Sequence, residues 1–337
     1  MRSALLRAAA LGLLVALAAA GGWFWSWANS PLSFDTATVI FIPRGSGVGR
    51  ITGLLAEKGI IADDLRFPLL ARLTGLGSRL RAGEFRVAPG LSPLALLRLL
   101  ERGEVVRHRI TVPEGWTVRQ VATLLAARGW VDADRFLALS TDARYISSLG
   151  LDVPALEGYL FPDTYVLVRG ATDEQLILRM MVSRFLAVWQ ELAEDGETTL
   201  TRHQVVTLAS IVEKETGAPL ERPLIARVFL NRLVRGMRLQ SDPTVIYGLP
   251  AFDGNLTRSD LRRKTPYNTY VIPGLPPGPI CNPGRAALAA VLHPADSDAL
   301  YFVSRNDGTH QFSRTLREHN RAVRRYQRAR HGKEAGK

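Results

Sequence analysis

The chain has 337 residues, a formal net charge of +12 and a single cysteine, Cys281. This length accommodates a membrane segment and two hydrophobic cores. One cysteine excludes an internal disulfide, and we expect Cys281 to be a small buried apolar residue rather than a nucleophile. The sequence contains no CxxC, no HExxH and no histidine cluster, which predicts that the protein uses no metal and no cofactor.

Residues 1–28 are predicted to form a transmembrane anchor. Arg2 and Arg7 precede an apolar run from residue 8 to residue 25, about long enough to span a bilayer core. Four aromatic residues stand where an interfacial belt belongs: Trp23, Phe24, Trp25 and Trp27. The alternative is a cleaved signal peptide, because Ala18-Ala19-Ala20 resembles a cleavage site. The apolar run continues beyond these alanines, which favours an uncleaved anchor.

The two early arginines set the expected orientation. The positive-inside bias keeps Arg2 and Arg7 in the cytoplasm, so we expect a single-pass protein of the cell inner membrane with its C-terminal part in the periplasm. A strongly positive chain often binds nucleic acid, but no nucleic-acid partner is expected in that compartment. Anionic lipid headgroups and the carboxylates of the cell wall are the expected counter-charges.

An internal repeat follows the anchor. Residues 42–45 (Ile-Pro-Arg-Gly) recur 70 positions later as residues 112–115 (Val-Pro-Glu-Gly), and the Leu-Leu-Ala run at 54–56 recurs with the same offset. Each copy is predicted to be a short strand, a glycine turn and a helix, with the strands at 39–42 and 109–112. A further strand at 82–87 and a helix at 93–101 lie between them. Residues 31–106 are therefore predicted to form a small α+β domain.

Residues 107–330 are predicted to form a larger α+β domain, followed by a tail at 331–337. Thr172 and Gln175 form a capping pattern for a long helix that is expected to turn Leu176, Met180 and Phe185 toward a core. The remaining elements are a helix from 223 to 236, a hairpin with strands near 300–303 and 310–312, and an arginine-rich helix from 315 to 331. The basic face of this last helix is interpreted as solvated.

The most informative residue is Glu215, near the end of another predicted helix. Thr201 and Gln204 form a T-x-x-Q capping box at its start, and Gly217 is expected to end it. The apolar face of this helix consists of Val205, Leu208, Ala209, Ile211 and Val212, and Glu215 falls inside that face. Burial raises the pKa of a carboxyl group, as a general acid requires. The alternative is a helix-end glutamate that reaches solvent or pairs with an arginine.

Three loops after this helix, at 240–248, 265–270 and 274–280, are rich in Pro, Gly, Tyr, Asn and Asp. Such loops on a helical scaffold commonly line binding sites. Flat tyrosine faces suit pyranose rings, and Asp and Asn suit sugar hydroxyls. The candidate substrate-binding residues are Asp242, Tyr247, Tyr267, Asn268 and Tyr270, with Glu157 and Asp163 upstream. For each of them loop shaping is the alternative role, because Asp before Pro and Asn in turns are structural by default.

Several runs in the sequence carry a family resemblance. They are 83–85 (GEF), 112–115 (VPEG), 157–165 (EGYLFPDTY), 210–216 (SIVEKET), 231–233 (NRL), 237–248 (MRLQSDPTVIYG), 267–270 (YNTY) and 274–278 (GLPPG). In this order they resemble the signature runs of the YceG-like endolytic murein transglycosylases. The resemblance implies that Glu215 is the catalytic residue, which the apolar-face argument selects independently. It also implies a LysM-like fold for residues 31–106 and action beside peptidoglycan synthases.

The expected function is that of a lyase acting on peptidoglycan glycan strands. It would cleave the β-1,4 bond between N-acetylmuramic acid and N-acetylglucosamine from within the strand, leave 1,6-anhydro ends and limit the length of nascent strands. Two alternatives stay open. A hydrolytic muramidase would use Asp242 or Asp163 as a second carboxylate. A membrane-tethered glycan-binding scaffold would use no catalysis.

Overall fold

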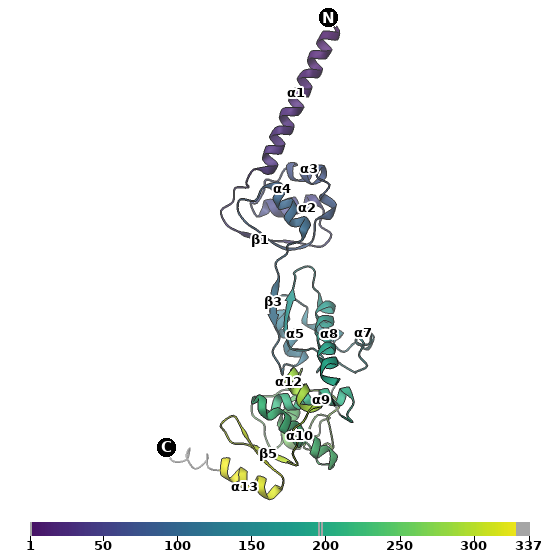
Figure 1. The fold of residues 1–337 in the computed structure, drawn as a ribbon, viewed down its shortest axis with the longest axis vertical. Helices are drawn as coiled ribbons and strands as arrows, with labels where there is room; N and C mark the ends of the chain where they lie inside the picture. The colour runs from purple at the N-terminus through teal and green to yellow at the C-terminus, as the bar shows by residue number, and fades with distance from the viewer. Residues whose placement is uncertain (1, 195, 197, 328–337) are drawn as a thin grey trace, which may run out of the picture. The chain divides into compact units, whose positions relative to one another are not determined.

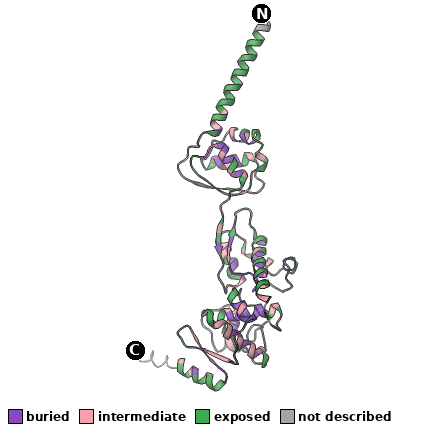
Figure 2. Cartoon of the chain, in the orientation of Figure 1, coloured by how far each residue is buried: buried purple, intermediate pink, exposed green. Residues whose placement is uncertain are grey.

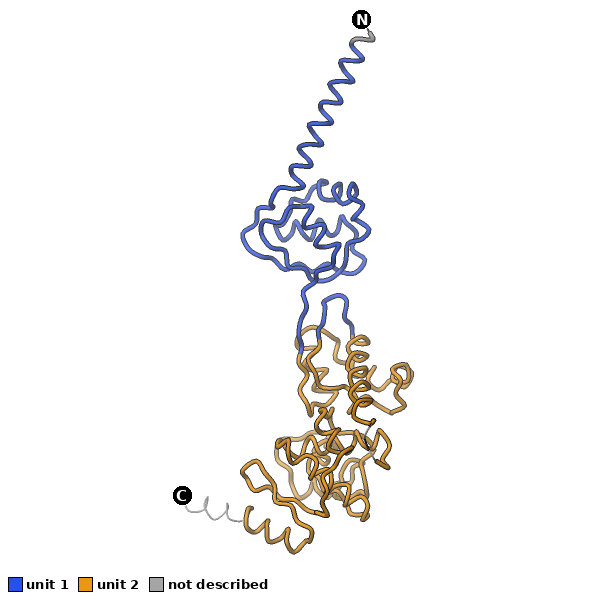
Figure 3. The backbone as a smooth tube through the Cα atoms, viewed as in Figure 1, with its two compact units in different colours: residues 1–110, 166–173 blue, residues 111–165, 174–337 orange. Residues whose placement is uncertain are grey.

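The computed structural model describes residues 2–194, 196 and 198–327. The described chain combines helices with short two-stranded sheets, which confirms the expected mixture of α and β structure. It divides into two compact units (Figure 3): unit 1 comprises residues 1–110 and 166–173, and unit 2 comprises residues 111–165 and 174–337. The boundary falls within β3 (His108–Thr111) and β4 (Thr164–Leu167), which pair in one sheet. The assignment of functional domains to 1–28, 31–106 and 107–330 stays a prediction.

The first helix, α1 (Arg2–Asn29), contains the predicted anchor. Its segment Leu5–Asn29 is long and apolar enough to cross a membrane, a test that a signal sequence also passes. The helix is exposed along most of its length (Figure 2). Only its end takes part in the core of unit 1: Ala28 is fully buried, and Phe24 and Trp27 pack against that core.

Unit 1 encloses its core between two strands and three helices (Figure 1). β1 (Thr38–Ile42) pairs antiparallel with β2 (Gly83–Val87), so that Ile40 lies opposite Phe85 and both are buried. The helices are α2 (Val48–Glu57), α3 (Arg66–Leu73) and α4 (Pro93–Arg102), with a 3₁₀ turn η1 at Gly77–Arg79. Both strands and α4 match the predicted ranges to within one residue.

The internal repeat takes the form of two strand–turn–helix copies, one beginning in each predicted domain. The helix of the second copy, α5 (Val118–Ala127), begins and ends 70 residues after α2. Gly45 and Gly115, at equivalent turns, have φ angles of 76° and 73°. This left-handed conformation favours glycine and explains why the residue recurs. The copies serve different sheets, because β1 pairs with β2 whereas β3 pairs with β4.

The long helix α8 (Glu174–Ala193) differs from its prediction in register. Leu176 is exposed, whereas Ile177, Leu178 and Met181 face the core together with Phe185. The helix begins at Glu174, two residues after Thr172, and the Thr172 hydroxyl accepts the backbone N–H of residue 168 at 3.0 Å instead. Helix periodicity alone allows either of two neighbouring apolar stripes of α8 to face the core. Packing against α6 (Ala133–Leu139) and α12 (Arg285–Leu292) buries the stripe that contains Ile177 and Met181. A short helix, α7 (Ala143–Ser148), follows α6.

The core of unit 2 surrounds α9 (Arg202–Glu215). Every residue from 205 to 212 is buried, and α10 (Arg222–Val234) and α12 both pack against the helix. The predicted capping box of Thr201 and Gln204 is present. The helix ends at Glu215 with Thr216 as its C-cap, so Gly217 follows the end as predicted, but it does not form a left-handed glycine cap, because Thr216 is extended and the φ angle of Gly217 is not positive. The short elements η2 (Pro219–Glu221), α11 (Asp242–Tyr247) and η3 (Asp260–Arg262) complete this region.

The C-terminal part forms the predicted hairpin and helix. β5 (Tyr301–Ser304) and β6 (His310–Ser313) are antiparallel, and α13 (Leu316–Tyr326) follows with a capping box between Thr315 and Glu318. The rest of the predicted arginine-rich helix and the tail at 331–337 lie outside the described residues.

Candidate active site

Glu215 is the last residue of α9, and its carboxyl group faces a loop that is distant in sequence. The Ser241 hydroxyl donates a short hydrogen bond to Glu215 Oε1. Ser241 is itself fully buried, and it immediately precedes α11. The loop before α11 therefore supplies the polar partner that a carboxyl group on an apolar helix requires.

Thr269 holds this loop in place. Its hydroxyl accepts the backbone N–H of Ser241 at 3.0 Å and lies 2.8 Å from the Thr244 hydroxyl, and its carbonyl accepts the backbone N–H of Gln240 at 3.2 Å. Gln240 has a φ angle of 52°, a left-handed conformation that is uncommon outside glycine. Such strain persists only where the surroundings fix it, and it is concentrated at functional sites.

Glu215 opens into a pocket of about 270 Å³. The residues that line it are Glu215, Arg232, Leu239, Gln240, Asp242, Tyr270, Phe302 and His319. Tyr270 donates its phenolic hydrogen to Asp242 Oδ1 at 2.7 Å. Three predicted residues are thus brought together from two helices and a loop: Glu215 from α9, Asp242 from α11 and Tyr270 from the loop after η3.

The surroundings of Glu215 raise its pKa to about 7. Burial is the largest cause, because it disfavours the charged carboxylate. The hydrogen bond from Ser241 acts in the opposite direction, the charge of Asp242 raises the pKa further, and Arg232 lowers it. A carboxylic acid with this pKa is protonated in a substantial fraction of molecules at neutral pH, as the sequence argument expected of a general acid.

Arg232 forms part of the wall and fixes the hairpin to α10. Its side chain is buried, with Nε donating to the carbonyl of Leu300 at 2.7 Å and Nη1 donating to the carbonyl of Leu239 at 2.7 Å. Its guanidinium group also lies 5.3 Å from the centre of the Tyr301 ring. Two carbonyl partners hold the positive charge beside the pocket without neutralising it.

A second group of predicted residues lies around Glu157. Its carboxylate accepts the backbone N–H of Val118, at the start of α5, at 3.1 Å and the Tyr247 hydroxyl at 3.2 Å. The Tyr247 and Tyr267 rings are 4.8 Å apart between centres. Burial raises the pKa of Glu157 to about 7, which its hydrogen bonds partly oppose. Glu157 and Tyr247 line a cavity of about 640 Å³, and Glu215 does not belong to its lining.

The helix α11 connects the two groups. Asp242 stands at its beginning beside the Glu215 pocket, and Tyr247 stands at its end beside Glu157. Six of the predicted residues are therefore divided between the two ends of one short helix. Glu215, Asp242 and Tyr270 lie at its beginning, and Glu157, Tyr247 and Tyr267 lie at its end. A displacement of α11 would affect both groups.

Asn268 and Asp163 have contacts that favour the alternative, loop-shaping role. Asn268 is fully buried, and its side-chain nitrogen donates to the carbonyls of residues 260, 261 and 263, most closely to that of Arg263 at 2.7 Å. Asp163 accepts from Arg184 Nε at 2.8 Å and lines neither of these two cavities. Their assignment as substrate ligands stays a prediction.

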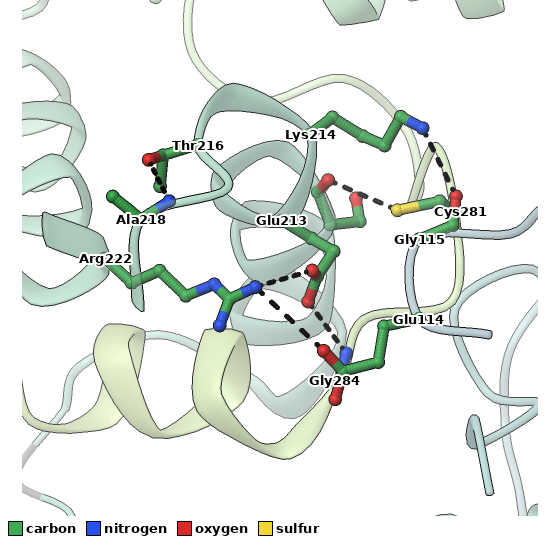
Figure 4. A network of polar contacts seen from close by, with 10 residues as sticks. Glu114, Gly115, Glu213, Lys214, Thr216, Ala218, Arg222, Cys281 and Gly284 are labelled. Carbon is green, nitrogen blue, oxygen red and sulfur yellow. Dashed lines mark hydrogen bonds and ion pairs between the residues drawn. The ribbon is translucent and has the colours of Figure 1, made fainter. Parts of the chain in front are cut away.

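Charged contacts fix the end of α9 on its other side (Figure 4). Arg222 Nη2 lies 3.0 Å from Glu213 Oε1 and 3.9 Å from Glu114 Oε2, and Glu213 also accepts the backbone N–H of Gly284 at 2.9 Å. Lys214 Nζ donates to a carbonyl of the loop that carries Glu114, at 3.4 Å. The helix turn that bears Glu215 is thus joined to α10, to the start of α12 and to the second repeat copy. Cys281 is buried nearby, and burial raises the pKa of its thiol, in agreement with the expected apolar role.

The sequence argument did not single out several residues of the pocket wall. Gln240, Phe302 and His319 come from three separate segments, and no local pattern links them to Glu215. The only local signal was the loop predicted at 240–248, which includes Gln240. In the part of the chain that the structure describes, no group of three or more His, Cys, Asp or Glu residues could hold a metal ion. Independence of metals stays a prediction.

Comparison with known proteins identifies the family. The model of the YceG-like family matches residues 40–325, which is most of the chain. The chain therefore belongs to the YceG-like family.

Two kinds of relative agree with this assignment. A protein of Bacillus subtilis named endolytic murein transglycosylase is 32% identical over 314 residues, which cover 88% of this chain and 87% of that protein. A protein of the same name from Streptococcus pneumoniae is 30% identical over 92% of this chain and 63% of its own length. A crystal structure of a putative YceG-like protein from Listeria monocytogenes has a TM-score of 0.58 and 31% identity, and the match covers 85% of this chain and 98% of that one.

Proposed function

We propose that this protein is an endolytic peptidoglycan lytic transglycosylase with Glu215 as its acid and base. The observation that carries the proposal is the position of Glu215: its buried carboxyl group accepts a hydrogen bond from Ser241, has a pKa raised to about 7 by burial, and opens into a loop-lined pocket. Membership of the YceG-like family and the shared name of its relatives support the same activity. The substrate is the glycan strand, cut at the β-1,4 bond between N-acetylmuramic acid and N-acetylglucosamine.

The reaction takes place in two proton transfers at one carboxyl group. Protonated Glu215 donates its proton to the glycosidic oxygen as the bond from that oxygen to C1 of the muramyl residue breaks. The glycosidic electron pair leaves with the oxygen, and positive charge develops at C1. The resulting Glu215 carboxylate then accepts the proton of the muramyl C6 hydroxyl, whose oxygen bonds to C1. The products are a 1,6-anhydro end and a free hydroxyl on the departing strand, and no water is consumed.

The neighbours of Glu215 suit both halves of this cycle. Ser241 donates to the carboxylate form and so stabilises it after the first transfer. Asp242 adds negative charge beside the pocket, which favours the positive charge that develops at C1. The Tyr270 hydroxyl holds Asp242 in place. Asp242, Tyr247, Tyr267 and Tyr270 are proposed as contacts of the sugar chain.

A hydrolytic muramidase is the second candidate, and one observation favours it. Asp242 lines the same pocket as Glu215, so a second carboxylate is present where a water molecule would have to be activated. Asp163 does not line that pocket. The two reactions differ in their products, because hydrolysis leaves a reducing end in place of an anhydro end.

The same proposal extends to location and partners. α1 is assigned as an uncleaved single-pass anchor in the inner membrane, with both units on the periplasmic side, supported by Arg2 and Arg7 before the apolar run. Residues 31–106 are assigned as a LysM-like domain, supported by their compact pair of strands with three helices. Peptidoglycan synthases are the proposed protein partners, because limiting the length of a nascent strand requires access to it.

The test is the chemistry of the cleaved ends. We would incubate the purified full-length protein with peptidoglycan and identify soluble and residual ends by mass spectrometry, in parallel with Glu215→Gln and Asp242→Asn. Anhydro ends that Glu215→Gln reduces by at least about 100-fold would support the proposal. Reducing ends that also require Asp242 would establish the muramidase instead. Cleavage that survives in Glu215→Gln would exclude Glu215 as the acid, and binding without cleavage by the wild type would favour the scaffold.

A further inference from the structure

Helix α3 carries an apolar stripe on its outer face. Leu65, immediately before the helix, and Leu69 and Leu73 within it follow one another at intervals of four residues, and their side chains are 81%, 45% and 67% exposed. Residues four apart lie on one side of a helix. The opposite side holds Phe67 and Leu70, which are buried in the core of unit 1. The core of unit 1 therefore covers only one of the two apolar faces of α3.

Two arginines flank the exposed stripe. At about 100° per residue, Arg66 and Arg72 fall on either side of the three leucines. Asp64 pairs with Arg66 at 2.6 Å, whereas Arg72 is exposed. An apolar stripe bordered by long cationic side chains is typical of a helix at a membrane surface, where the cations reach the phosphates while the leucines enter the acyl region.

Contacts within unit 1 connect α3 to the end of α1. The Arg66 guanidinium carbon lies 4.9 Å from the centre of the Trp27 ring and 6.0 Å from that of Trp23. Trp27 packs against the core of unit 1, and Ala28 is fully buried in it. The last turns of α1 and the first turn of α3 are therefore parts of one packed structure, and α3 lies where α1 leaves the unit (Figure 1).

We infer that α3 lies in the headgroup region of the same bilayer that α1 crosses, with the leucine stripe in contact with phospholipid acyl chains. The inference rests on the proposed anchoring of α1. Exposed Trp23 and Trp25 mark the interfacial end of that helix, since tryptophan is enriched at the boundary between lipid and water. Because Arg66 stacks on this aromatic end, α3 is at the same depth. Anionic phospholipids complement the flanking arginines.

This arrangement would hold unit 1 against the membrane by two elements. A single-pass anchor alone leaves the attached unit free to tilt, whereas a second interfacial helix beside it restricts that tilt. Unit 1 would then occupy a fixed height above the bilayer. The contact of Arg66 with the aromatic end of α1 is what favours a lipid contact over a protein partner.

Site-specific fluorescence tests the contact in the full-length protein. The protein would be reconstituted into liposomes of phosphatidylcholine and phosphatidylglycerol, with an environment-sensitive probe on Leu69→Cys or on Val39→Cys. Val39 is a matched control, because its side chain is 39% exposed and it lies on β1 in the same unit. Native Cys281 is fully buried, and labelling of the parent protein measures its background. Lipids with a nitroxide on the acyl chain and iodide in the buffer serve as the two quenchers.

The expected result is that nitroxide lipids quench the Leu69 probe several-fold more than the Val39 probe, while iodide quenches chiefly the Val39 probe. Quenching of both probes by iodide alone would overturn the inference. Protection of the Leu69 probe from both quenchers would also overturn it and point to a protein cover, such as a second copy of the chain. Extraction with alkaline carbonate separates these results from a failure of anchoring, because an unanchored chain would leave the liposomes whichever probe it carried.

Discussion

At the scale of single residues, the pKa of Glu215 makes activity depend on pH in a definite direction. The proposed reaction begins with the protonated acid, so turnover should fall as the pH rises through about 7. Glu157 has a pKa of about 7 as well, and its ionisation could cause the same fall in turnover, the alkaline limb of the pH profile, by changing the structure. The measurement is the pH profile of anhydro-end formation in the wild type and in Glu157→Gln, which keeps an acceptor for its partners. A limb that vanishes in Glu157→Gln would reassign the titration to Glu157.

The raised pKa of Glu215 also makes the stability of the folded protein depend on pH. The pKa of Glu215 is about 7 in the folded state against 4.5 for the free group, so the folded state binds the proton more tightly. The stability that this provides is complete below about pH 4.5 and is lost as the pH rises through 7. By linkage, the loss is on the order of 3 kcal/mol.

Glu215→Gln should therefore gain stability relative to the wild type as the pH increases. The glutamine cannot ionise, so the variant avoids the cost of burying a carboxylate at alkaline pH. Thermal melts of both detergent-solubilised proteins at pH 5 and pH 8 measure the effect. A difference between the two proteins that is the same at both pH values would show that Glu215 titrates as an ordinary exposed group.

Ser241 should tune the acid without being consumed in the reaction. Ser241→Ala removes a hydrogen bond that stabilises the Glu215 carboxylate, so its pKa should rise and the alkaline limb should move upward by on the order of one unit. Turnover should also fall, because the carboxylate is the base of the second step. Ser241→Thr retains the hydroxyl and is the control. An identical pH profile in the alanine and threonine variants would mean that this hydrogen bond does not act on Glu215.

At the scale of elements, the end of α9 depends on its ion pair with α10. Glu213→Ala would leave Arg222 with only the 3.9 Å contact to Glu114, in a position where the Arg222 side chain is 11% exposed. Removing one member of a buried pair typically costs about 3–5 kcal/mol. Lys214→Ala on the same turn removes one long, partly buried hydrogen bond from an otherwise exposed residue and should change stability by less than about 0.5 kcal/mol.

Denaturant unfolding of the two variants measures this contrast, and peptidoglycan cleavage below the unfolding transition adds a second readout. If the pair positions Glu215, activity should fall in Glu213→Ala while the fold persists. Equal stability of the Glu213→Ala and Lys214→Ala proteins would show that water or another group replaces the lost partner.

The elements that could be predicted are those whose signals are local. The caps at Thr201 and Thr315 depend on residues three positions apart, and the hairpin depends on one turn, so all were found. The register of α8 was missed because Leu176 and Ile177 are equally apolar, and only distant helices decide which one is buried. The burial of Glu215 was predictable from its own helix. Its pocket was not, because Gln240, Phe302 and His319 meet it only through the packing of separate segments.

At the scale of the whole molecule, the repeat shows how one supersecondary unit serves two purposes. In unit 1 the helix α2 begins at Val48 after Gly47, which offers no side-chain cap. In the second copy the helix α5 has a capping box at Thr117, and its first N–H binds Glu157. The same fold segment is thus a plain core helix in one place and a support for a candidate site residue in the other. The difference arises from the residues at the helix start, where four N–H groups lack partners within the helix.

The fate of the N-terminal segment decides whether α1 is an uncleaved membrane anchor or a cleaved signal peptide. We predict that the mature protein retains residues 1–20. α1 is continuous from Arg2 to Asn29, so Ala18-Ala19-Ala20 lie within a helix, whereas a peptidase binds its substrate in extended form. The burial of Ala28 fixes the end of this helix in unit 1, which opposes unwinding of the turns before it. Intact-mass spectrometry of the protein from isolated membranes checks the prediction. Loss of the first twenty residues, with release of the remainder by alkaline carbonate, would instead make α1 a signal peptide and leave the leucine stripe of α3 without its membrane.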